Sequence, residues 1–209
     1  HHIDEVMSQG MPVVLFDRIS DQIECDKVVV DDIQGAYQAV NHLIGKGRKN
    51  ILLLTTQDYI NVGRLRTQGY IKAIQDSALV LDNELIIKVV DTHNSNAALP
   101  ALEAQIEKTI SKYPQIDAIF TVNEIYAAAA LRVLRQARIQ VPDKIAVTCF
   151  TDGLISKFST PTLTTVSQHS EEIGKKAAKI LIDRLSSDDN EGPPKIEVIK
   201  CTVVERESS

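Results

Sequence analysis

Polar residues that follow three apolar runs are the best-placed residues of this chain for ligand chemistry. Asp17 and Arg18 follow the first run, Asn123 follows the second, and Thr151 and Asp152 follow the third. If the runs are parallel strands, their carboxyl ends form the edge at which open α/β sheets bind ligands. Asp17, Asn123 and Asp152 have an equally good alternative role, because Asp and Asn also form turns and cap helices.

Two arginines add a second kind of candidate. Arg64 and Arg66 fall in the first turns of a helix expected from about residue 61 to residue 76. The ordinary expectation for each is a solvated cation or a surface ion pair. Two cations near the positive end of a helix are unfavourable unless an anion or an acid compensates them. This charge argument favours, as the partner of Arg66, either a ligand or an interlobe carboxylate, that is, an acid from another lobe of the folded chain.

Catalytic motifs are missing from the sequence. Gly45-Lys46-Gly47 is the only G-x-G, and it follows a helix instead of opening one, which indicates a helix C-cap. There is no G-x-S-x-G, P-loop or H-E-x-x-H, and His42, His93 and His169 lack a second His or Cys at ligand spacing. We expect no enzyme activity, catalytic residue, cofactor or metal. A nucleophile assembled from distant parts of the chain is the open alternative.

Composition limits the partners of this chain. Its 209 residues are 44% hydrophobic and carry a net charge of −5, so no basic stripe for direct contact with nucleic acid is expected. No apolar run approaches the roughly 18 residues of a membrane helix, and no signal peptide is visible at the start. The three cysteines are far apart, which fits reduced thiols in a cytoplasm.

Strand-length apolar runs alternate with amphipathic segments along the chain. Continuous runs at 12–16, 27–30, 51–54, 118–120 and 145–147 predict buried parallel strands. Helices are predicted from Ile33 to Ile44 with Asp32 as the cap, and over about 61–76, 96–112, 123–137 and 170–185. A polar loop at 186–194 precedes a last strand over about 196–204. The order predicts doubly wound α/β layers, and the short helix at 3–9 leads into a strand as if the front of the fold were missing.

The order of several motifs resembles the effector-binding domain of LacI/GalR-family transcriptional repressors. The matching segments share the family's strand and helix signatures, and they are Met11–Arg18, Val30–Ile44, Arg66–Tyr70, Asp117–Glu124, Val141–Val147, Pro161–Val166 and Gly174–Ala178. Each segment alone is weakly specific, whereas seven in the right order across almost the whole chain are specific. They correspond to roughly the latter two-thirds of that family's chain.

The resemblance implies a type I periplasmic-binding-protein-like fold of two α/β lobes joined by three crossover strands. Residues 1–56 and 165–192 would form a truncated N-terminal lobe, and residues 57–161 and 195–207 the C-terminal lobe. The family's helix-turn-helix has no counterpart in the chain. The family's effector contacts in the interlobe cleft carry over to Asp17, Arg18, Arg66, Asn123 and Gln168.

One departure from the family concerns the effector itself. Where the family often has Gly-Phe-Asp-Asp, this chain has Cys149-Phe150-Thr151-Asp152, so a hydroxyl replaces a carboxylate that accepts charge-assisted hydrogen bonds. The chain also has no Trp, so a stacking platform for a sugar ring would come from a residue such as Tyr59, Tyr126 or Phe150.

The function implied is that of a cytoplasmic regulator that senses a small molecule, a sugar or sugar derivative. Effector binding would shift the lobes and change binding to a DNA operator through the absent N-terminal domain. A homodimer is expected, with interface candidates on the helix from Ser170 to Leu185, although Gly174 packed against its own sheet is the alternative. The rival function is that of an exported solute-binding protein of a transport system, which shares this fold.

Overall fold

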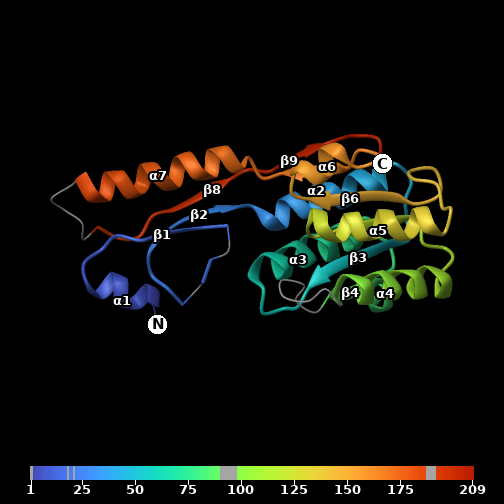
Figure 1. Cartoon of the computed structure of the whole chain (residues 1–209), viewed down its shortest axis with the longest axis horizontal. Coiled ribbons are helices and arrows are strands. Elements are labelled where there is room, and N and C mark those ends of the chain that lie inside the picture. The colour runs from blue at the N-terminus through green and yellow to red at the C-terminus, as the bar shows by residue number, and fades with distance from the viewer. Residues whose placement is uncertain (1, 18, 21, 90–97, 187–191) are drawn as a thin grey trace. The chain divides into compact units, whose positions relative to one another are not determined.

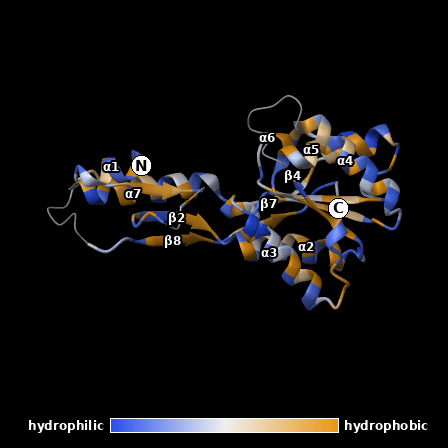
Figure 2. Ribbon diagram, turned by 90° about the horizontal axis from the view of Figure 1, so that it is seen from below, coloured by the Kyte–Doolittle hydropathy of each residue, from blue (hydrophilic) through white to orange (hydrophobic). Residues whose placement is uncertain are grey.

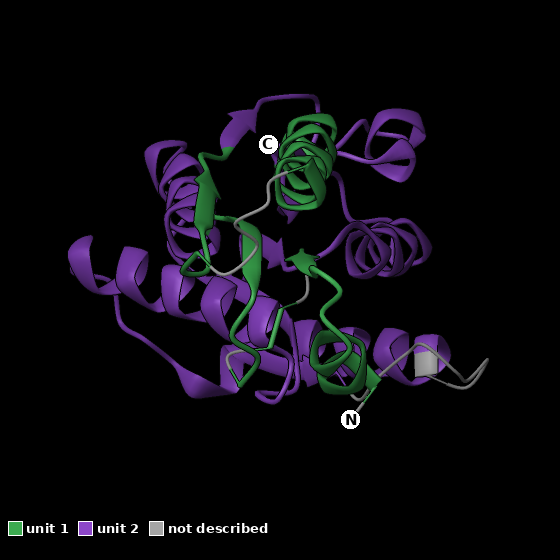
Figure 3. Cartoon of the chain, turned by 90° about the vertical axis from the view of Figure 1, so that its left-hand side faces the viewer, with its two compact units in different colours: residues 1–31, 168–201 green, residues 32–167, 202–209 purple. Residues whose placement is uncertain are grey.

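The chain folds into two compact units. The computed structural model describes residues 2–17, 19–20, 22–89, 98–186 and 192–209. The smaller unit comprises residues 1–31 and 168–201, and the larger comprises residues 32–167 and 202–209 (Figure 3). The chain therefore passes from one unit to the other three times, after residues 31, 167 and 201.

The larger unit is organised around a six-stranded sheet with the order β4-β3-β5-β6-β7-β9. Its strands are β3 (Ile51–Thr56), β4 (Ile86–Val89), β5 (Ala118–Thr121), β6 (Ala146–Phe150), β7 (Thr164–Ser167) and β9 (Thr202–Val204) (Figure 1). Only β9 runs antiparallel to its neighbour, β7. Every residue of β3, β5 and β6 is buried, as expected for parallel strands that are covered on both faces.

Helices cover both faces of this sheet (Figure 2). Helices α2 (Asp32–Gly45) and α3 (Asn61–Asp76) pack against each other on one face, and α4 (Ala98–Lys112) and α5 (Glu124–Gln136) pack on the other. A short helix α6 (Leu154–Phe158) follows β6, and the 3-10 turn η1 (Asn83–Leu85) precedes β4. Gly69 allows α2 and α3 to approach closely, because an added Cβ would lie 2.3 Å from the carbonyl oxygen of Ile33.

The smaller unit has a parallel three-stranded sheet with the order β1-β2-β8. Its elements are α1 (His2–Ser8), β1 (Val14–Phe16), β2 (Asp26–Val30), α7 (Ser170–Ser186) and β8 (Ile196–Ile199). Helix α7 packs against the strands, and Arg184 on it binds both carboxylate oxygens of Asp26 at 2.8 and 2.9 Å. Phe16, Ile196 and Val198 on the two outer strands are exposed.

The parallel α/β fold class expected from the sequence is confirmed, and the predicted helices and strands are present near their expected positions. Gly47, with φ +86, follows the end of α2 at Gly45, as the C-cap interpretation requires. The start expected at residue 96 for α4 and most of the loop expected at 186–194 lie outside the described residues. No helix in the described ranges is long and apolar enough to span a bilayer.

Three features differ from the sequence-based expectation. The single last strand is instead two strands, because β8 pairs with β2 in the smaller unit whereas β9 pairs with β7 in the larger one. Strand β4 and helix α6 were not anticipated. The boundaries of the compact units also differ from the expected lobe boundaries. Residues 32–56 lie in the larger unit, because α2 packs on α3 and β3 lies between β4 and β5.

Candidate functional site

Arg66, on helix α3, contacts α2, β6 and the loop that follows β5. It is 4% exposed, and its Nε donates to Asp32 Oδ1 at 2.7 Å. Its Nη1 donates to the carbonyl oxygen of Val122 at 2.7 Å, and its guanidinium lies 3.7 Å from the centre of the Phe150 ring. The acid that compensates Arg66 is therefore Asp32, from the start of α2 in the same compact unit.

These contacts place Arg66 next to two other predicted site residues. Val122 immediately precedes Asn123, and Phe150 immediately precedes Thr151. Strands β5 and β6 are neighbours, with Thr121 opposite Cys149, so the loops that follow them emerge side by side. The structure thus brings Arg66, Asn123 and Thr151 to one edge of the sheet. Arg64, by contrast, binds Asn61 Oδ1 through its Nη2 at 2.7 Å.

Asn123 caps helix α5 and retains a free donor. Its Oδ1 accepts from the backbone N–H of Tyr126 at 2.9 Å, which is the capping role that its residue type favours. Its side-chain Nδ2 has no hydrogen-bond partner within the described ranges. The cap and the ligand role are therefore compatible, because one amide atom is used by the helix and the other is available.

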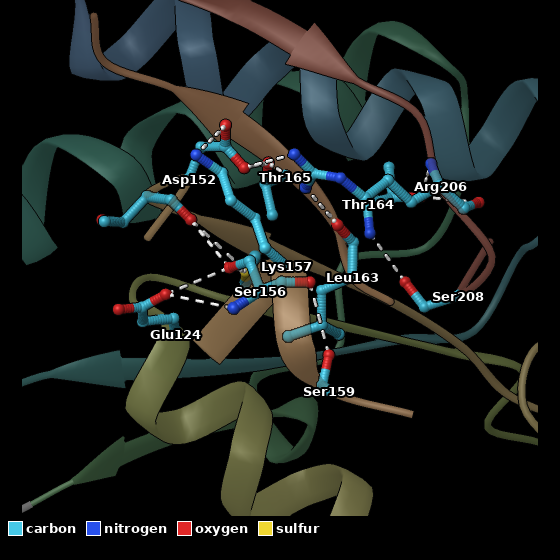
Figure 4. Close-up of polar contacts among 12 residues, drawn as sticks. Glu124, Asp152, Ser156, Lys157, Ser159, Leu163, Thr164, Thr165, Arg206 and Ser208 are labelled. Carbon is cyan, nitrogen blue, oxygen red and sulfur yellow. Dashed lines mark hydrogen bonds and ion pairs between the residues drawn. The ribbon is translucent and has the colours of Figure 1, made fainter. Parts of the chain in front are cut away.

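Thr151 and Asp152 begin the loop between β6 and α6. Thr151 has φ +85, a left-handed conformation that is uncommon and strained for a β-branched residue. Asp152 points away from Glu124 toward the C-terminal segment (Figure 4), where its Oδ1 accepts from Arg206 at 2.6 Å and from Thr165 at 3.0 Å. The contacts of the Asp152 carboxylate therefore tie this loop to β7 and to the segment after β9.

The remaining predicted site residues belong to the smaller unit. Asp17 directly follows β1, is exposed, has φ +59, and its carboxylate has no partner among the residues that are described. Gln168 lies where the chain enters the smaller unit after β7. Arg18 lies outside the described residues.

The three aromatic candidates for a stacking platform differ sharply in exposure. Phe150 is fully buried and faces Arg66, and Tyr126 is 3% exposed, so neither offers a free ring face. Tyr59, in the turn between β3 and α3, is 75% exposed. Of the three, only Tyr59 is accessible to a ligand.

A thiol close to this edge is chemically inert. Burial raises the pKa of Cys149 to about 12, which keeps its thiol protonated and non-nucleophilic at neutral pH. All three cysteines are described and buried, and none of them forms a disulfide.

Sequence reasoning missed three residues that organise this edge. Asp32 was expected only to cap a helix, Arg206 had no local signal, and Glu124 was noted only as part of a motif. Each acts through a partner far along the chain, with Arg66, Asp152 and Ser156 at separations of 34, 54 and 32 residues. A single sequence carries no signal for such pairs.

Open parallel α/β sheets of this kind bind ligands at the carboxyl edge of their strands. Residues 40–209 match the family described as a periplasmic binding protein-like domain. The chain therefore belongs to this family.

Individual relatives and solved structures agree with this assignment. The HTH-type transcriptional repressor PurR of Aliivibrio fischeri (strain MJ11) is 30% identical over 181 residues, 87% of this chain and 52% of that protein. The solved complex of the transcriptional regulator CelR with cellobiose has a TM-score of 0.85 and 27% identity, over 98% of this chain and 61% of that chain. A regulatory protein of the LacI family from Chloroflexus aggregans, at 24% identity, has the same fold with a TM-score of 0.84, over 99% of this chain and 72% of that chain.

The resemblance to LacI-type regulators expected from the motifs is confirmed by these comparisons. The chain spans about half the length of the curated relatives it matches. Those relatives are named as transcriptional regulators and not as enzymes or exported binding proteins.

Proposed function

We propose that this chain is the effector-binding part of a LacI-type transcriptional regulator and that its effector is a sugar or sugar derivative. The observation that carries the proposal is the Nδ2 of Asn123, a donor without a partner among the described residues at the carboxyl edge of the sheet. The complex of the related CelR with cellobiose supports a sugar as the ligand class. Amide donors, carboxylate acceptors and hydroxyls together match the donors and acceptors of sugar hydroxyls.

The proposed residues have distinct roles. On the larger unit, Asn123 donates from Nδ2 and Thr151 is proposed as a neighbouring contact. Asp17 of the smaller unit stays in the proposal as a contact implied by the family. Tyr59 is proposed to cover an apolar face of the sugar ring, since its own ring is exposed. Arg18, Asp152 and Gln168 stay in the proposed site as further contacts implied by the family. Arg66 also stays in the proposed site as a contact implied by the family, and it holds Val122 and Phe150, the residues that precede Asn123 and Thr151, in place.

The test is a thermal-shift screen of cellobiose, ribose, sugar phosphates and nucleobases against this chain, followed by calorimetry on each hit. Asn123→Asp keeps the capping oxygen and removes the amide donor, so it should weaken a hit at least tenfold while the melting temperature of the free protein changes little. Asn83→Asp, at the exposed start of η1, is the matched control. The site assignment fails if Asn123→Asp and Asn83→Asp bind a hit equally well.

For the whole protein we propose cytoplasmic regulation of transcription, with DNA contacted by a helix-turn-helix segment outside this chain. The names of the relatives support it. The exposed apolar residues of the three-stranded sheet support completion of the smaller unit by further chain in the whole protein. A gel-shift titration of the whole protein on its own promoter region, with and without a hit, should show an effector-dependent change in DNA affinity. An unchanged affinity would contradict the regulatory role.

We also propose a homodimer that uses helix α7. Ile182 and Leu185 are 60% and 63% exposed on this helix. Gly174 is exposed as well, and an added Cβ there would meet nothing within 4 Å, so this glycine is not packed against its own sheet. Sedimentation should show a dimer that Ile182→Glu with Leu185→Glu dissociates. A wild-type chain that remains monomeric at high concentration would contradict this interface.

A further inference from the structure

A carboxylate on helix α5 binds the start of helix α6. Glu124 Oε2 accepts from the backbone N–H of Ser156 at 3.3 Å and from its hydroxyl at 3.1 Å (Figure 4). Ser156 is fully buried, and its hydroxyl is also 3.2 Å from the carbonyl oxygen of Thr151. The contact therefore joins the start of α5, which follows β5, to α6, which follows β6.

This carboxylate replaces a cap that helix α6 lacks. Gly153 occupies the N-cap position of α6 and makes no side-chain capping bond, because it has no side chain. The N–H groups of a first helical turn need an acceptor from elsewhere. Glu124 supplies that acceptor to Ser156 from a different helix.

Gly153 is required by this contact and not by its backbone conformation. Its φ of −91° is available to any residue. An added Cβ would lie 2.3 Å from Glu124 Oε1 and 2.5 Å from Oε2, closer than such atoms approach. Because a glutamate carboxylate ends a flexible side chain, it can move aside from a larger residue. Gly153→Ala should therefore displace the carboxylate without unfolding the unit.

We propose that Glu124 is a positioning residue which locks the β5–α5 loop to the β6–α6 loop and so sets the geometry of Asn123 and Thr151. Asn123 directly precedes Glu124 in the chain, and Thr151 lies two residues before Gly153. The single proton of the Ser156 hydroxyl is shared between Glu124 Oε2 and the carbonyl oxygen of Thr151, whose backbone is left-handed, so Ser156 links the carboxylate to this backbone. The effect on effector affinity rests on the proposed function, whereas the lock between the loops does not.

The lock is tested without any ligand by amide hydrogen exchange, resolved by NMR at Ser156. Glu124→Ala should raise the exchange rate of this amide at least tenfold, and so should Gly153→Ala. The double variant should exchange no faster than either single variant, because both changes remove the same contact. Glu124→Gln keeps an acceptor oxygen and should restore most of the protection.

Matched controls separate the lock from general loosening. Glu107→Ala alters an exposed glutamate of α4, and Gly45→Ala adds a Cβ that meets nothing within 4 Å. Both should leave the exchange of the Ser156 amide unchanged. If Glu124→Ala also leaves it unchanged, or if the two single effects multiply in the double variant, the lock is overturned.

The consequence for binding is measured with whichever sugar shifts the melting temperature of the wild-type chain. Glu124→Ala and Gly153→Ala should each weaken that sugar at least tenfold, and Glu124→Gln should weaken it less. Faster exchange at Ser156 with unchanged affinity overturns the positioning role. If no compound of the panel shifts the wild-type chain, the proposed function fails, and the exchange rates alone decide whether the lock exists.

Discussion

Replacement of Asp32 by alanine tests the ion pair that anchors Arg66 beside Val122 and Phe150. Both side chains of the Asp32–Arg66 pair are 5% exposed, so the change leaves a guanidinium buried without its counter-charge. Removing one partner of a buried pair costs about 3–5 kcal/mol. Arg66 keeps its bond to Val122 and its contact with the Phe150 ring, which places the expected cost near the lower end of that range, about 3 kcal/mol.

The stability of the larger unit can be measured by tyrosine fluorescence during urea unfolding. The protein has no Trp, and its five tyrosines, at positions 37, 59, 70, 113 and 126, all belong to the larger unit. Tyrosine fluorescence during urea unfolding therefore reports the unit that contains the ion pair. A loss of about 3 kcal/mol corresponds to a fall of about 6–12 °C in the melting temperature of a chain of this size.

A double variant sharpens the test. Asp32→Ala with Arg66→Met removes both charges, so it should be at least about 1 kcal/mol more stable than Asp32→Ala alone. Asp183→Ala, an exposed aspartate of α7 in the smaller unit, is the control and should change the tyrosine transition little. The reasoning is refuted if Asp32→Ala costs less than about 1 kcal/mol, or if adding Arg66→Met destabilises the protein further.

Three further predictions concern the packing and charge of the two units. Gly69→Ala should cost about 1–3 kcal/mol in urea unfolding, because its Cβ would meet the α2 backbone at 2.3 Å, whereas Gly45→Ala, with open space, should not destabilise the protein. Burial lowers the pKa of His42, and the negative charge of Glu205 offsets only part of this effect. The folded state therefore favours the neutral imidazole. Stability should therefore be full above about pH 6.5 and fall as the pH drops below it, and a His42→Gln variant should flatten this dependence in urea titrations. Burial opposes ionisation of Asp26, but its hydrogen bonds with Arg184 and with the backbone N–H of Lys195 outweigh burial and lower the pKa of its carboxyl group. In hydrogen exchange at neutral pH, Arg184→Met should therefore reduce the protection of the β2 amides. That loss should shrink in acid as the carboxylate becomes protonated, and equal losses at both pH values would contradict the ion-pair account.

Local patterns predicted most of the elements, although not β4 or α6, and several residues at the edge of the proposed site. Continuous apolar runs predicted β3, β5 and β6, because a strand covered on both faces favours apolar side chains on both of its sides. The helical spacing predicted α3 from residue 61 to residue 76, as observed. Asn123 and Thr151 were predicted at the ends of strands from the apolar runs that precede them. The charge argument on Arg66 predicted a ligand or an interlobe carboxylate, whereas the acid that binds it is Asp32 of the same compact unit.

Tertiary structure alone decided which side chains meet. Nothing local distinguishes Asp32 from the neighbouring Asp31 as the partner of Arg66, and nothing local links Asp152 to Arg206 or Glu124 to Ser156. It also decided that the last apolar segment divides between two sheets after residue 199. The physical reason is that the periodicity of apolar residues indicates which residues are buried. Which polar side chains form pairs depends instead on how the packing of the sheet brings together helices and strands from distant parts of the chain.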